Sequence, residues 1–217
     1  MAKRDNHYEA AFEAYLRQLG VPYMAVDETQ RSLLGSVPEH TAPASLKSID
    51  FLVSPRLGPP RLGPPRTGHS SGEATGWLVD VKGRRFPTGS SYWKNWSTGD
   101  ELLSLAAWEQ LLGPRLSGLL VFAYNVVGNR APLAPEELFV FRGGLYGFVG
   151  IRLAHYASWS KPLSKKWGTV TMPTDRFRSL ARPVRELFGV GRSADEFQVS
   201  SSMFQVKQQL ETWNPGT

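Results

Sequence analysis

Two short apolar segments of the sequence each contain one aspartate, and these aspartates are well suited to carry chemistry. Asp50 lies in the apolar stretch 49–53, and Asp80 lies in the stretch 77–82. Burying an ionised carboxylate without compensation costs at least several kcal/mol, so such a residue is normally paired, hydrogen-bonded or bound to a metal. Carboxylates are hard oxygen ligands of the kind that Mg²⁺ takes. The two aspartates therefore indicate a magnesium site if their segments are neighbours.

Lys82 follows Asp80 by two residues, so the alternation of a strand places the two side chains on the same side, together with Leu78. From there the lysine would point into the same space as the aspartates. A structural ion pair of Lys82 with Asp80 or Asp50 explains the pattern equally well. The sequence leaves both interpretations open.

Two glutamates near the N-terminus lie one helical turn apart. Like charges at the spacing of Glu9 and Glu13 cost a few tenths of a kcal/mol in an isolated helix. Arg17 is placed to pair with Glu13, whereas Glu9 has no equally placed downstream partner. This favours Glu9 as the residue that faces a cation, with a solvated helix face as the alternative for both glutamates.

The elements that position these residues follow from apolar periodicity and from turn residues. A first helix is predicted after a cap at Asp5 or Asn6 and ends at 20–22, and a second helix opens with a capping box of Thr98 and Glu101. A last helix is predicted after a Thr174 cap, with a break or kink at Pro183. The second helix is expected over 100–112, and strands over 21–26, 45–53, 76–84, 119–127 and 169–172, with a hairpin of 138–142 and 145–153 around Gly143-Gly144.

The order of these elements resembles the PD-(D/E)XK nuclease superfamily, which has the restriction-endonuclease-like fold. The shared order is a helix with Glu, a strand, a strand with Asp, a strand with Asp-x-Lys, a helix and a strand, over residues 7–127. The resemblance implies an α/β fold with a central mixed sheet flanked by helices, extended here by a C-terminal β-hairpin and a helical region. The heptapeptide HYEAAFE at 7–13 also resembles the signature of the poorly characterised HYExAFE family.

The nuclease resemblance implies a role for individual residues. Asp50 and Asp80 would be metal ligands together with the main-chain carbonyl of Val81, Lys82 would be the motif lysine, and Glu9 would be the helix glutamate. The proline that nominally precedes the first aspartate is Ile49 here. Aspartate at position 80, where the family more often has glutamate, would draw a metal closer to the sheet.

These roles imply a hydrolytic mechanism. Mg²⁺, or Mn²⁺ in its place, would lower the pKa of a bound water and stabilise charge on the scissile phosphate. Lys82 would orient or deprotonate the attacking water, and Glu9 would assist through a second metal or a water. Gln110 on the second helix, and Glu13, are accessory candidates.

Cations and aromatic residues alternate just after the strand that carries Asp80 and Lys82, a composition that suits contacts to a nucleic-acid backbone and stacking on bases. The alternative is that the two tryptophans of this stretch fill the core beside the second helix. A second basic and aromatic stretch spans 156–167, and it either lines a groove or forms a solvated rim. The candidate nucleic-acid-binding residues are Arg84, Arg85, Trp93, Lys94 and Trp96.

Composition narrows the classes of function. With 25 Lys+Arg against 19 Asp+Glu the formal net charge is +6, which favours polyanionic partners such as DNA. The absence of cysteine excludes a disulfide scaffold, a thiolate zinc site and a cysteine nucleophile. The longest apolar stretch, 118–127, is about half of the ~20 residues that a membrane-spanning helix needs. We expect a cytoplasmic protein with no membrane segment.

The chain of 217 residues is predicted to form one domain. It divides into a nuclease-like core at 7–127, an extension at 128–188 and a tail at 189–217 whose order the sequence leaves open. The tandem repeat of RLGPP marks a low-complexity insertion at 55–72.

The sequence thus predicts a metal-dependent nuclease that hydrolyses phosphodiester bonds in DNA or another nucleic acid. The alternatives are a catalytically inactive nucleic-acid-binding module and a protein-interaction module on the same fold. A homodimer is a further expectation left open by the sequence.

Overall fold

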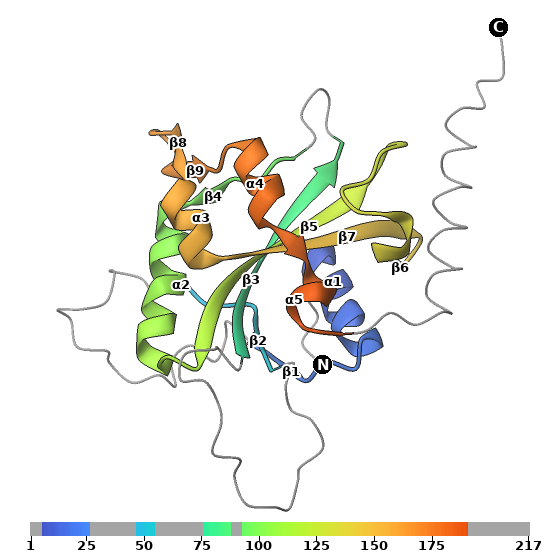
Figure 1. The fold of residues 1–217 in the computed structure, drawn as a ribbon, viewed down its shortest axis with the longest axis horizontal. Coiled ribbons are helices and arrows are strands. Elements are labelled where there is room, and N and C mark those ends of the chain that lie inside the picture. Colours follow the sequence, from blue (N-terminus) through green and yellow to red (C-terminus); the bar gives the residue numbers. More distant parts are fainter. Residues whose placement is uncertain (1–5, 27–46, 55–75, 88–92, 191–217) are drawn as a thin grey trace, which may run out of the picture.

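A mixed β-sheet of seven strands runs through the molecule, with helices on both of its faces (Figure 1). The computed structural model describes residues 6–26, 47–54, 76–87 and 93–190. The strand order is β1-β2-β3-β5-β7-β10, and β6 pairs with β7. The strands are β1 Tyr23–Ala25, β2 Phe51–Val53, β3 Gly76–Phe86, β5 Leu116–Val126, β6 Leu138–Phe141, β7 Gly144–Arg152 and β10 Arg182–Pro183.

The two longest strands, β3 and β5, form the parallel centre of this sheet. They pair from Gly76↔Leu116 to Phe86↔Val126, while the other neighbours in the sheet are antiparallel. Helix α2, Gly99–Leu112, lies in the connection between them. β5 is a nearly continuous apolar run because helices cover both faces of the sheet, whereas β3 is apolar over 77–79 and carries charged residues from Asp80 onwards.

One face of the sheet is covered by α1, His7–Gln18, and by α5, Val184–Leu187. The Asn6 side chain begins α1 by accepting the backbone N–H of Tyr8. Phe12 and Leu16 of this helix are fully buried against the sheet. This packing fixes the side chains at the start of α1 relative to β3.

The other face is covered by α2, by α3, Leu153–Trp159, and by α4, Thr174–Leu180. The predicted capping box is confirmed: Thr98 caps the backbone of Glu101, and the Glu101 side chain accepts the Thr98 N–H. A second sheet of three strands, in the order β4-β9-β8, adjoins the start of α2. Its strands are β4 Ser97–Thr98, β8 Lys161–Ser164 and β9 Thr169–Thr171, and a short 3₁₀ helix, η2, spans Pro135–Glu137.

The predicted fold class is confirmed as an α/β structure with a central mixed sheet flanked by helices. The predicted hairpin of 138–142 and 145–153 forms and extends the main sheet. The division into a core and an extension stays a prediction. The insertion at 55–72, the tail beyond residue 190 and the cap candidate Asp5 lie outside the described residues.

Four local predictions need correction. Of the strand predicted over 45–53, the described residues 47–50 are not in a strand, because the chain bends at Asp50, and β2 covers only 51–53; residues 45 and 46 lie outside the described residues. The hairpin turn consists of Arg142 and Gly143, with φ of 49° and 74°, so the primed turn begins one residue earlier than predicted. Thr174 is the first residue of α4 and not its cap, and Pro183 pairs with β7 in β10 and does not kink a helix. Helix α3 was not predicted.

No helix in the described parts of the chain is long and apolar enough to cross a membrane.

Candidate active site

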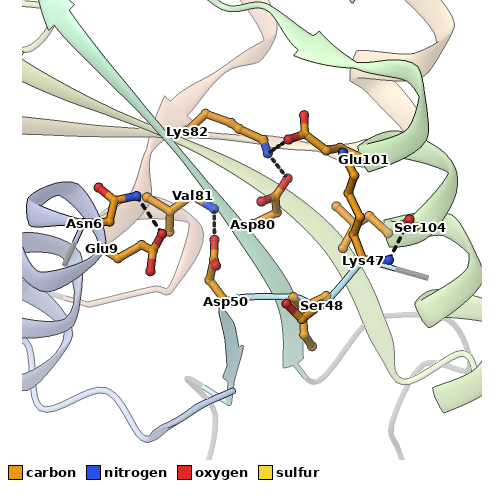
Figure 2. A pocket seen from close by; sticks show the side chains of 12 residues that line it. Asn6, Glu9, Lys47, Ser48, Asp50, Asp80, Val81, Lys82, Glu101 and Ser104 are labelled. Atoms are coloured by element: carbon orange, nitrogen blue, oxygen red, sulfur yellow. Dashed lines mark hydrogen bonds and ion pairs between the residues drawn. The ribbon is translucent and has the colours of Figure 1, made fainter. Parts of the chain in front are cut away.

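A pocket of about 410 Å³ opens where the start of α1, the segment before β2, the middle of β3 and the first turns of α2 meet (Figure 2). Glu9, Asp50, Asp80 and Lys82 all line it. The structure therefore brings together four of the residues selected from the sequence, although they come from three separate elements or segments.

Asp50 reaches this pocket because β2 does not extend past it. Its backbone N–H still pairs with the carbonyl of Val79 at 2.9 Å, but its carboxylate Oδ2 accepts the backbone N–H of Val81 at 2.7 Å. The carboxylate thus accepts the hydrogen bond that a backbone carbonyl of a longer β2 would otherwise accept from the edge of β3. The N–H and C=O of one strand residue point to the same side, so the Val81 carbonyl faces this edge too.

Asp80 and Lys82 lie on the α2 side of β3, as strand alternation predicts. Lys82 Nζ is 2.8 Å from Asp80 Oδ2 and 2.9 Å from Glu101 Oε1. The side chains of Lys82 and Asp80 are only 11% and 15% exposed. Water and salt screen such a pair weakly, so the attraction between the two charges is strong.

Glu101 is a site residue that the sequence indicated only as a helix cap. Its Oε2 accepts the Thr98 N–H at 2.8 Å and the Ser97 hydroxyl at 2.7 Å, which leaves Oε1 directed at Lys82 (Figure 2). The capping-box pattern predicts the first of these bonds. Nothing in the local sequence indicates the contact with Lys82, because it depends on how α2 packs against β3.

Burial and like charge raise the pKa values of both aspartates. Burial, followed by the nearby charges of Asp80 and Glu9, raises the pKa of Asp50 to about 8. Burial also raises the pKa of Asp80, against the opposing effect of Lys82. Without a cation beside them, Asp50 and Asp80 therefore resist ionisation.

The pKa values of Lys82 and Glu101 shift in the directions expected for an ion pair. Burial alone would lower the pKa of Lys82, but attraction to Asp80 and Glu101 outweighs it and the pKa is raised. Burial alone would raise the pKa of Glu101, but Lys82 and the bonds from Thr98 and Ser97 hold it at about 2. Lys82 is therefore an ammonium, and Glu101 a carboxylate, throughout the neutral range.

The two glutamates of α1 behave differently, as their spacing suggested. Glu9 lines the pocket, and its Oε1 accepts a hydrogen bond from Asn6 Nδ2 at 2.6 Å. Glu13 instead accepts from Arg17 Nη2 at 2.5 Å and from the Tyr23 hydroxyl at 3.0 Å. Glu13 is not among the residues that line the pocket, so its accessory role is not supported.

Gln110 also lies away from the pocket. It lines a separate hollow near the end of α2, together with Leu116 and Ser117 of β5. Gln110 is in the last turns of α2, whereas the pocket contacts the first turns, so the length of the helix separates them. Gln110 therefore does not line the pocket that holds Asp50, Asp80 and Lys82, and its accessory role stays a prediction without support.

The five candidate nucleic-acid-binding residues fall into two groups. The Arg84 guanidinium lies 3.9 Å from the centroid of the Trp96 ring, and Trp96 and Arg85 are exposed. Trp93 instead packs edge-on against Phe86 and Tyr124, so for this residue the alternative, a core contact, is correct. Lys94 is half-buried, and its carbonyl accepts the Tyr124 hydroxyl. Contact of any of them with nucleic acid stays a prediction.

The donor atoms of the pocket fit Mg²⁺ better than they fit a transition metal. Among the described residues, no three His, Cys, Asp or Glu side chains come together as a complete ligand set. Mg²⁺ usually keeps several waters and takes only one or two protein carboxylates, which Asp50 and Asp80 can provide beside the Val81 carbonyl. A cation there would also favour the ionised form of Asp50, which burial and its acidic neighbours otherwise oppose.

Comparisons with known proteins give one solved structure to report. No protein-family model matches the sequence, and no curated protein matches it. A search of solved structures finds the Holliday junction resolvase Hjc from Archaeoglobus fulgidus, with 11% sequence identity and a TM-score of 0.45 over 88% of this chain and 100% of that chain. A functional assignment must therefore come from the geometry of the pocket.

Proposed function

We propose that this protein is a divalent-metal-dependent nuclease that hydrolyses phosphodiester bonds in nucleic acid, with DNA as the expected substrate. The observation that carries the proposal is the pocket itself, where Asp50, Asp80 and Lys82 meet Glu9 of α1. Their order along the chain is that of the PD-(D/E)XK superfamily, which the sequence resembles. The net charge of +6 is consistent with a polyanionic substrate.

Asp50, Asp80 and the Val81 carbonyl would hold the metal ion, Mg²⁺ or alternatively Mn²⁺. When bound, the ion would lower the pKa of a coordinated water and offset negative charge on the scissile phosphate. The hydrogen bond from the Val81 N–H keeps the Asp50 carboxylate beside β3, so these donors are positioned before any ligand arrives.

Lys82 would act as a cation and a hydrogen-bond donor. Its raised pKa keeps it protonated at neutral pH, so of the two roles that the sequence suggested, orienting the attacking water is favoured over deprotonating it. The ammonium would also offset charge that develops on the phosphate in the transition state. Glu9 would accept a hydrogen bond from a water in the pocket.

Glu101 would be a positioning residue for Lys82. Two hydrogen bonds to Oε2 hold the Glu101 carboxylate, and Oε1 holds the ammonium on the pocket side of β3. Without it, Asp80 would be the remaining carboxylate within ion-pair distance of Lys82 among the described residues, and Asp80 is also a proposed metal ligand.

The direct test is a cleavage assay on plasmid DNA, single-stranded DNA and single-stranded RNA, with Mg²⁺, with Mn²⁺ and with EDTA. The wild type, Asp80→Asn and Lys82→Ala are compared with Glu186→Gln, which changes an exposed glutamate of α5 that does not line the pocket. We expect metal-dependent cleavage by the wild type and by Glu186→Gln only. Equal cleavage by all four proteins would indicate a contaminant and would remove the proposal.

A structural ion cluster is the second candidate role, because Lys82 is already paired with both Asp80 and Glu101. In that case the protein would be a protein-interaction module, and Asp80→Asn would lower the melting temperature without affecting nucleic acid. An inactive nucleic-acid-binding module would instead bind independently of Mg²⁺, and Asp80→Asn would bind like the wild type.

A further inference from the structure

A basic arm lies beside the start of α2, formed by α3, β8, β9 and α4 (Figure 1). Residues 153–182 contain one acidic residue, Asp175, against six cations. Such an imbalance within one segment favours a polyanionic partner. The cations are Lys161, Lys165, Lys166, Arg176, Arg178 and Arg182.

The arm also exposes two tryptophans, which is unusual for rings of that size. Trp167 is 70% exposed and Trp159 is 43% exposed. The Arg176 guanidinium lies 4.4 Å from the centroid of the Trp159 ring, and Lys166 Nζ lies 5.2 Å from that of Trp167. Exposed aromatic area rimmed by polar groups marks an interaction site, and the paired cations favour an anionic partner.

Backbone hydrogen bonds attach the arm to the element that carries Glu101. The N–H of Gly99 donates to the carbonyl of Gly168 at 2.8 Å, and Ser97 pairs with Val170 in the second sheet. Gly168 follows Trp167 directly, and Gly99 is two residues before Glu101. A nucleic-acid strand bound to the arm would therefore lie near the first turn of α2, which also contributes to the pocket.

We propose that the basic arm binds unpaired nucleotides, with its lysines and arginines at the phosphates and with bases stacked on Trp167 and Trp159. In a duplex the faces of the bases are covered by their neighbours, so a tryptophan ring can stack only on a base that is unpaired or at an end. The inference rests on the proposed nuclease function and narrows its substrate to nucleic acid with a single-stranded segment next to the cleaved bond.

The test is a binding measurement in EDTA, where a metal-dependent enzyme cannot cut. Fluorescence anisotropy would follow a labelled 20-nucleotide oligo-dT and a labelled blunt duplex of 20 base pairs. We expect the wild type to bind oligo-dT more tightly than the duplex. Trp167→Ala should raise the Kd for oligo-dT about fivefold or more, because stacking is worth about 1–3 kcal/mol per base by alanine substitution.

Two variants separate stacking from charge and from folding. Trp167→Phe keeps an aromatic ring and should restore most of the oligo-dT affinity, while Lys165→Ala should weaken both probes alike and reduce the salt dependence of Kd. Trp167 is mostly exposed, so circular dichroism of Trp167→Ala should match the wild type.

Three results would overturn the inference. The first is an unchanged Kd of Trp167→Ala for oligo-dT. The second is an equal loss of affinity for oligo-dT and for the duplex. The third is a Trp167→Ala protein that binds oligo-dT normally but no longer self-associates in sedimentation, which would make the arm a protein interface. The binding assay contains no metal and does not depend on cleavage. If the wild type binds oligo-dT through Trp167 but cuts no substrate in the cleavage assay with Mg²⁺ or Mn²⁺, the nuclease proposal is refuted and the binding inference stands.

Discussion

The pocket and the basic arm both adjoin the start of α2, but they hold their charges in opposite surroundings. In the pocket, Lys82 and Asp80 are nearly buried, and each charge has a fixed partner. In the arm, Lys161, Lys165 and Lys166 are exposed. Burial shifts pKa values and fixes geometry, which chemistry needs, whereas exposed cations give long-range attraction that salt screens. This difference fits the two proposals, in which the pocket catalyses and the arm provides affinity.

The largest effect that tests this division is expected for Asp80→Asn. The variant should lose detectable cleavage, because it removes a proposed metal ligand that is also one of the two carboxylate partners of Lys82. Its affinity for oligo-dT in EDTA should change little, since the arm is untouched. Cleavage assays and anisotropy on one protein preparation measure both quantities. Loss of binding together with cleavage would show that the two regions are not separate.

Glu101→Gln should lower kcat by about 10- to 100-fold, in line with other residues that orient a catalytic group without contacting substrate. KM should change little, because the substitution leaves the proposed binding surface of the arm unchanged. Asp100→Asn is the matched control: it removes a neighbouring, exposed charge from the same first turn of α2 and should retain activity. If both variants lose kcat equally, the effect belongs to the start of the helix and not to Lys82.

Salt concentration should affect the two regions differently, with a smaller effect than the substitutions above. Raising the salt concentration from 50 to 200 mM should weaken oligo-dT binding by about twentyfold if roughly three arm lysines each neutralise a phosphate. The difference in melting temperature between the wild type and Lys82→Ala should stay constant, because the pocket charges are buried. A difference that shrinks with salt would mean that water reaches the ion pair.

The last expected effect is on the pH dependence of the free energy of unfolding in EDTA. The folded protein holds the proton of Asp50 more tightly than the unfolded chain does, because burial and its acidic neighbours raise the pKa from 3.8 to about 8 on folding. The contribution of this group to the free energy of unfolding is therefore complete below about pH 4 and decreases as the pH rises to 8. The melting temperature should fall as the pH rises across that range.

Asp50→Asn should make this pH profile shallower, while the raised pKa of Asp80 should preserve part of it. Glu101 does not interfere, because its pKa of about 2 affects stability only at lower pH, where acid removes its contribution. Adding Mg²⁺ should raise the melting temperature more at pH 8 than at pH 5, since the ion competes with the proton. An identical profile for Asp50→Asn would exclude Asp50 as the source.

Local patterns in the sequence were enough to predict much of the fold. The apolar runs of β3 and β5, the Asn6 cap and the Thr98 capping box depend on residues close together in the chain, and the structure contains all of them. The proximity of Asp80 and Lys82 also follows from strand alternation. The same local patterns misassigned the length of β2 and missed α3, where tertiary contacts override propensity.

Contacts between distant segments decided the rest. Three features each join residues that no periodicity relates. They are the hydrogen bond from the Val81 N–H to Asp50, the contact of Glu101 with Lys82, and the packing of Trp93 against core rings. Gln110 and Glu101 share a helix, and only the packing of α2 decides which of them reaches β3. Residue types and spacings therefore determined which groups could do chemistry in this protein. The docking of α1 and α2 on the sheet determined which of them meet, because a buried charge is stable only where the fold supplies its partner.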